Sequence, residues 1–157
     1  MRTIFKAPVM IACFLFLSAA FSWAGGKTAV NSKNFSEVQN KNWRLTEVKI
    51  GSGVIKIDRA DIPIDIYTVK FESDRLSGIG APNRFFSWYI VEEGNTISIG
   101  GIAGTRMAPL YETENFTEYE YFMCLEKVNH WYYINGNLEL HSVKNENQVT
   151  LIFKRNS

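Results

Sequence analysis

The two histidines, His130 and His141, are the residues whose type and spacing come closest to a chemical site. Between them, Asn135-Gly136 is the favoured pair for a tight type I′ turn. In the hairpin that this turn predicts, Trp131 faces Leu140 on an apolar side and the two imidazoles lie opposite each other on the other side. Two imidazoles supply half of a zinc shell, and local spacing adds no cysteine or aspartate. We therefore expect a solvated pair, with metal binding as the alternative.

Other constellations offer less chemistry. No serine lies in a nucleophile-elbow sequence, and the doublet Gly100-Gly101 is followed by neither a helix nor a lysine, as a phosphate loop requires. Asp58, Asp61 and Asp65 are close in sequence, but Pro63 separates them on an expected loop. We therefore assign no catalytic residue and no cofactor, and expect that the protein is not an enzyme.

The N-terminus has the three-part layout of a secretory signal. Arg2 and Lys6 form a basic start, an uncharged apolar stretch runs over residues 7–21, and Ser22-Trp23-Ala24 offers small residues at a cleavage site. We expect residues 1–24 to be a signal peptide and the product to be periplasmic or secreted. The apolar stretch is short for a bilayer span, so a membrane-anchoring helix is the first alternative. The second is a lipoprotein attached through Cys13.

The composition of the chain limits the classes of partner that it could bind. The 157 residues include 17 basic and 16 acidic side chains, with interspersed signs and a net charge of +1. Nucleic acid requires a basic face, so we expect no nucleic-acid partner. No later stretch is apolar enough for a transmembrane segment. After cleavage Cys124 is the remaining cysteine, which excludes an intramolecular disulfide, and its apolar neighbours predict a buried thiol.

Strand patterns dominate after a polar leader at residues 25–42, so we place the folded domain at residues 43–157. One segment without Gly or Pro, Glu112–Val128, predicts a helix capped by Thr113 or Asn115. Its apolar residues recur every three positions and predict one buried stripe of Phe116, Tyr119, Phe122, Leu125 and Val128. A single helix among antiparallel hairpins gives an α+β, mainly β domain. The expected strands are Trp43–Ile50, Ile64–Glu72, Phe85–Glu92, Thr96–Ile102, Trp131–Ile134, Leu138–Val143 and Val149–Phe153.

Two short segments carry a family resemblance. Asn83-Arg84-Phe85 and, about twenty residues later, Thr105-Arg106-Met107 follow the order of the two signature segments of the META domain family of HslJ-like, heat-shock-named proteins. The chain from Trp43 to Lys154 resembles this family. The resemblance implies a curved antiparallel sheet approaching an incomplete lipocalin-like barrel, with one helix packed against it. It implies no reaction, and we expect the signature residues to be structural.

The chain departs from the family pattern at two positions. Family members often carry a cysteine before the Asn-Arg element and another after Thr-Arg-Met-Ala, and here Pro82 and Pro109 stand in their place. With proline at both positions, we expect neither the disulfide that the family pattern would imply nor any redox chemistry at this site. Arg84 and Arg106, on neighbouring loops, are possible ligand contacts for a carboxylate or phosphate. The alternative is that they bind Glu112, Glu114 or loop carbonyls within the fold.

The resemblance implies a non-catalytic exported envelope module that acts through protein interaction or in stress tolerance. We expect a monomer that binds an unknown envelope protein. One alternative is a carrier that holds a lipid or other small apolar ligand in the barrel, and a weaker one is a protease inhibitor. Large inward side chains would favour a filled barrel over a carrier. The residues expected to face inward are Phe71, Phe85, Trp88, Ile97, Trp131 and Phe153.

Overall fold

The computed structural model describes residues 34–58, 61–63, 65–108, 116–144 and 146–156. The expected signal peptide and Cys13 lie outside these residues, as do Pro109 and the two predicted helix caps, Thr113 and Asn115. Within the described part of the chain, no helix is long and apolar enough to cross a bilayer.

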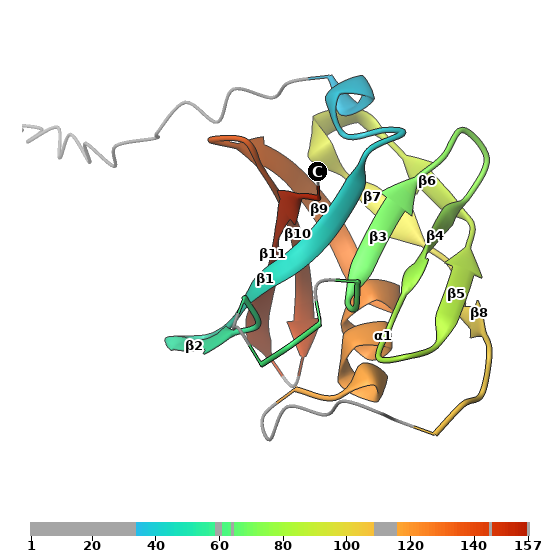
Figure 1. Ribbon diagram of the computed structural model, residues 1–157. Helices are drawn as coiled ribbons and strands as arrows, with labels where there is room; N and C mark the ends of the chain where they lie inside the picture. The colour runs from blue at the N-terminus through green and yellow to red at the C-terminus, as the bar shows by residue number, and fades with distance from the viewer. Residues whose placement is uncertain (1–33, 59–60, 64, 109–115, 145, 157) are drawn as a thin grey trace, which may run out of the picture.

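A strongly curved antiparallel sheet wraps around the core (Figure 1). Its strands follow the order β8-β5-β4-β3-β1-β11-β10-β9, and β2 pairs with the second half of β1. The bounds are β1 Asn42–Ile50, β2 Gly53–Lys56, β3 Thr68–Phe71, β4 Leu76–Ile79, β5 Arg84–Ser87, β8 Ala103–Gly104, β9 Val128–Ile134, β10 Asn137–Lys144 and β11 Asn147–Arg155.

A two-stranded sheet lies between the ends of the large one. Its strands are β6 (Tyr89–Val91) and β7 (Ile97–Ile99), joined through the 3-10 turn η2 (Glu93–Asn95). An isolated bridge between Thr96 and His130 connects this hairpin to β9 without a continuous ladder. The curved sheet therefore stays unclosed, which confirms the predicted incomplete barrel.

Strand β1 bends because its register changes. The ladder with β11 shifts between Leu45 and Glu47, and such a bulge increases the twist and bend of a strand. Thr46, at this point, donates its hydroxyl to the Ile152 carbonyl over 3.1 Å. On its other edge, β1 pairs first with β3 and then, beyond the bulge, with β2. The sheet can therefore curve around the core.

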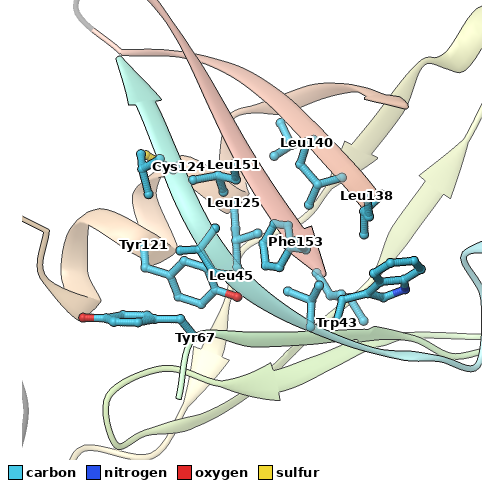
Figure 2. Close-up of a cluster of buried hydrophobic side chains, with 14 of the residues drawn as sticks. Trp43, Leu45, Tyr67, Tyr121, Cys124, Leu125, Leu138, Leu140, Leu151 and Phe153 are labelled. Atoms are coloured by element: carbon cyan, nitrogen blue, oxygen red, sulfur yellow. The ribbon is translucent and has the colours of Figure 1, made fainter. Parts of the chain in front are cut away.

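Aromatic and branched side chains fill the interior (Figure 2). Trp43, Phe71 and Phe153 are fully buried, and Tyr67 and Tyr121 contact each other edge to face at 5.2 Å. The expected inward positions at residues 71, 85, 97, 131 and 153 are all buried. Large side chains thus fill this part of the interior.

Trp88 was expected to face inward, and this prediction was wrong because its side chain is 55% exposed. The chain leaves the large sheet at this residue, between β5 and β6. Successive side chains of an extended segment point to opposite sides, so Trp88 points outward like Phe86 and Ile90. The indole lies against the backbone of Gly100, where an added Cβ would be only 2.1 Å from the ring. A side chain at position 100 would therefore displace this indole from its place.

Helix α1 (Glu118–Glu126) packs at one end of the sheet (Figure 1). It begins later than predicted because Thr117 is the N-cap and forms a capping box with Glu120. It ends before Val128, which opens β9. The predicted stripe was wrong on Tyr119, which is 71% exposed. Leu125 of that stripe is buried as predicted. A three-residue spacing drifts around a 3.6-residue turn, so Tyr121 joins the buried face in place of Tyr119. Cys124 is buried, as expected.

The described part of the predicted leader packs onto the domain. The short 3-10 turn η1 (Phe35–Glu37) lies at the end of the barrel opposite α1 (Figure 1). Phe35 is 8% exposed and makes edge contacts with Phe71 at 5.3 Å and Trp131 at 4.8 Å. The Trp43 indole also donates to the Val38 carbonyl over 2.9 Å. The packed region therefore begins before Trp43, which corrects the predicted boundary.

Candidate functional site

The two signature segments meet beside the first turn of α1. Strands β5 and β8 are antiparallel neighbours, with Phe85 opposite Gly104. This pairing places the loop before β5 next to the segment after β8. The Arg84 carbonyl accepts the Thr105 N–H over 3.0 Å, and the Thr105 hydroxyl accepts the Arg84 N–H over 3.2 Å. Strand order thus brings together segments that are about twenty residues apart.

Asn83 connects the two segments through its side chain, which is almost completely buried. Its Oδ1 accepts the Thr105 hydroxyl over 2.8 Å and the Met107 N–H over 2.7 Å. Its Nδ2 donates to the Met107 carbonyl over 3.1 Å and to the Glu118 carboxylate over 2.6 Å. An amide side chain has two donor hydrogens and an acceptor oxygen, and all are engaged here. The side-chain amide of Asn83 therefore has all its donors and its acceptor oxygen hydrogen-bonded within the fold.

Glu118 is the residue that sequence reasoning missed. It lies in the first turn of α1 and is 9% exposed. Its Oε1 accepts the backbone N–H groups of Ala81 and Asn83, the latter over 2.8 Å, while Oε2 accepts Asn83 Nδ2. Carboxylates are favourable at helix N-termini, and this one also caps a loop that would otherwise leave donors unpaired. One feature of the sequence could have indicated its position. Glu118 directly follows Thr117, and Thr117 and Glu120 have the Thr-x-x-Glu spacing of a capping box, which marks the start of a helix.

Gly80 makes room for the Glu118 carboxylate. A Cβ at this position would lie 2.3 Å from Glu118 Oε1 and 2.8 Å from the Phe122 ring. The adjacent Ala81–Pro82 peptide bond is cis. Phe85 is 3% exposed and packs edge to face on Phe122 at 5.2 Å. The first signature segment thus surrounds the helix start with both polar and apolar contacts.

Arg84 and Arg106 are exposed and do not converge on one site. Arg84 lines two hollows, one of about 450 Å³ over the sheet and one of about 380 Å³ beside Pro82. Arg106 lines a third hollow of about 590 Å³, next to Met107 and Tyr119. Neither guanidinium forms an ion pair with a residue that the structure describes, and the expected partners at positions 112 and 114 lie outside it. The two arginines thus line different hollows of the described surface.

The predicted hairpin register is confirmed: His130 lies opposite His141 and Trp131 opposite Leu140. His141 Nε2 is 3.2 Å from a Glu139 carboxylate oxygen, and this hydrogen bond lowers the pKa of Glu139. His130 instead contacts the neighbouring Asn129 amide oxygen at 3.0 Å. Within residues 34–156, gaps excepted, no group of three metal-ligating side chains forms. The two histidines therefore acquire no third ligand in the described region.

Known proteins that resemble this chain share its architecture. A protein from Burkholderia xenovorans, solved by NMR, matches with a TM-score of 0.60 and 21% identity, covering 98% of this chain and 99% of its own. A duf4847 family protein from Bacteroides vulgatus matches with a TM-score of 0.53 and 12% identity, covering 78% and 96%. These likenesses support the fold alone. No curated protein is significantly similar in sequence.

The family model of the META domain matches residues 36–157. This range begins at the η1 turn rather than at β1, in agreement with the packing of Phe35, and it includes both signature segments, their Asn83–Glu118 hydrogen bonds and the whole curved sheet. The chain belongs to the META domain family.

Proposed function

We propose that this protein is exported to the cell envelope and acts there as a non-catalytic module that binds a protein partner. The filled interior carries this proposal, because a lipocalin-like carrier needs inner space and Trp43, Phe71 and Phe153 occupy it. The buried polar groups of the signature, Asn83 and Glu118, bind each other rather than face a substrate. Export is supported by the signal-like pattern of residues 1–24.

The outer surface offers what a binding module needs. Phe86, Trp88 and Ile90 are 58%, 55% and 54% exposed and lie at alternate positions of the β5–β6 segment. Alternate residues of a strand share a face, so these three side chains form a continuous apolar row. Exposed apolar rows bordered by polar residues are typical of protein-interaction surfaces.

Native mass spectrometry of the protein isolated gently from its own envelope fraction tests the proposal. We expect the mass of an unmodified chain that begins at Gly25, with no bound ligand. Chemical crosslinking should then identify one defined protein partner. A lipid-modified N-terminus at Cys13 would favour the lipoprotein alternative. An added mass of a few hundred daltons, lost on denaturation, would contradict the filled-barrel account and favour the carrier.

A further inference from the structure

The outer face of the large sheet carries rows of side chains that follow directly from its register. Arg44 pairs with Thr68, Thr68 with Ile79, and Ile79 with Arg84, so one row crosses four strands. Cross-strand partners point to the same face of a sheet. Arg84 is exposed, and this row therefore lies on the outside, away from the aromatic core.

A second row runs parallel to the first. It connects Asn42, Lys70, Ser77 and Phe86 through consecutive strand pairs. The short side chain of Ser77 lies between the longer Lys70 and Phe86. This difference in length leaves the hollow of about 450 Å³ that both rows line. A hollow of this volume accommodates a few side chains of a bound peptide.

Positive charge exceeds negative charge around this hollow. Lys70 Nζ and Arg75 Nε approach the same carboxylate, that of Glu72, at 3.4 Å and 2.8 Å. Arg84 lines the hollow without an ion pair among the described residues. Asp65 is the acidic residue in the lining. Three cations thus face two carboxylates, and the exposed Arg84 guanidinium retains its fork of donors for a carboxylate from outside.

The hollow continues into the apolar row. Phe86 lines it and is 58% exposed, and Trp88, 55% exposed, follows two residues later, just beyond the end of β5. An extended chain repeats every two residues over about 6.8 Å, so successive side chains of a bound strand reach successive positions of this row. Apolar contact and carboxylate recognition are therefore available side by side.

We propose that this surface binds an extended acidic segment of a partner protein, with its carboxylates on Arg84 and Lys70 and its apolar side chains on Phe86 and Trp88. The proposal rests on the interaction function proposed above and names the chemistry of the partner. Charge complementarity selects an acidic rather than a basic segment.

Peptide binding to the purified protein tests the chemistry. The probes are three fluorescein-labelled decapeptides that alternate Asp with Leu or Phe in different orders, measured by fluorescence anisotropy. We expect saturable binding that weakens as salt is raised from 50 to 300 mM, because the charges are exposed. Arg84→Ala should weaken binding by about tenfold, and Phe86→Ser by a similar factor.

Arg106→Ala is the matched control, since it removes the same charge from a neighbouring loop that lines a different hollow. It should change the affinity by less than about twofold. Circular dichroism of each variant excludes unfolding as the cause. Equal losses at Arg84 and Arg106, equal binding of peptides with Lys in place of Asp, or no saturable binding by any of the three peptides would overturn the proposal.

Site-specific photo-crosslinking in cells separates this inference from the proposed function. A photoreactive residue replaces Ser77, on this face, or Val143, which is 49% exposed on a strand separated from β4 by β3, β1 and β11. Capture of one protein from position 77 that is lost in Arg84→Ala supports the inference. Capture from position 143 alone leaves the interaction function standing and sinks the inference, and capture from neither contradicts both.

Discussion

Exchanging Asn83 and Glu118 tests whether the signature segments are held by the buried hydrogen bonds between them. Asn83→Asp keeps the shape of the side chain but replaces the Nδ2 donor, 2.6 Å from Glu118 Oε2, with a second carboxylate oxygen. A hydrogen bond to a charged group is lost and a buried like-charge contact appears. We expect the free energy of unfolding to fall by about 3–5 kcal/mol.

Glu118→Gln is milder, because its remaining oxygen can still accept the N–H groups of Ala81 and Asn83. Its new amide nitrogen, however, would face the Asn83 donor. We expect a loss of about 1–3 kcal/mol, the range for one unsatisfied buried polar pair. In the double variant the donor and acceptor are exchanged, so the new amide at 118 can donate to the new carboxylate at 83.

The double variant should therefore be more stable than the sum of the single effects predicts, by at least about 1.5 kcal/mol of coupling. Urea denaturation followed by tryptophan fluorescence gives the three free energies, with Glu126→Gln, on the last turn of the same helix, as a control for charge removal. Additive single effects, within about 0.5 kcal/mol, would refute the assignment of a direct Asn83–Glu118 interaction.

Three further outcomes follow from other parts of the fold. Gly100→Ala should push Trp88 outward, because the added Cβ would lie 2.1 Å from its ring, and should shift the tryptophan emission to longer wavelength. This red shift should be absent when the same change is made in a Trp88→Phe variant. Burial raises the pKa of Tyr121 well above its usual value, so the contribution of Tyr121 to stability should be constant below about pH 10 and should be lost at higher pH, because the unfolded chain ionises there first. Tyr121→Phe should flatten that alkaline limb in urea titrations. Thr117→Ala removes the helix cap and should lower the free energy of unfolding by about 1 kcal/mol, whereas Thr117→Ser should retain most of it.

The sequence was most informative where structure is set locally. Asn135 and Gly136 adopt the positive φ angles of 51° and 83° that a type I′ turn requires, and the turn then fixes the pairing of Trp131 with Leu140. The same reasoning failed for β4, where Ser77-Gly78 interrupts the apolar alternation. There the strand depends on pairing with β3 and β5 rather than on its own pattern.

The buried site could not be predicted in the same way, because its members come from three separate segments. Nothing near Glu118 in the sequence indicates that its carboxylate turns away from solvent to accept donors about 35 residues earlier. That direction depends on Gly80, which leaves the space, and on the β5–β8 pairing, which places Met107 beside Asn83. Long-range packing of this kind becomes visible only when all the elements are assembled.

The same network also clarifies the departure at Pro82. The resemblance implies a cysteine here and another shortly after Met107, a pair that would tie the two signature loops together. In this chain, Asn83 ties them by hydrogen bonds in both directions with the Met107 backbone, at 2.7 Å and 3.1 Å. Glu118 then fixes Asn83 to the helix, so a non-covalent connection already joins these loops. A buried, satisfied network of this kind holds the two loops together without a covalent bond, in a chain that has proline at position 82.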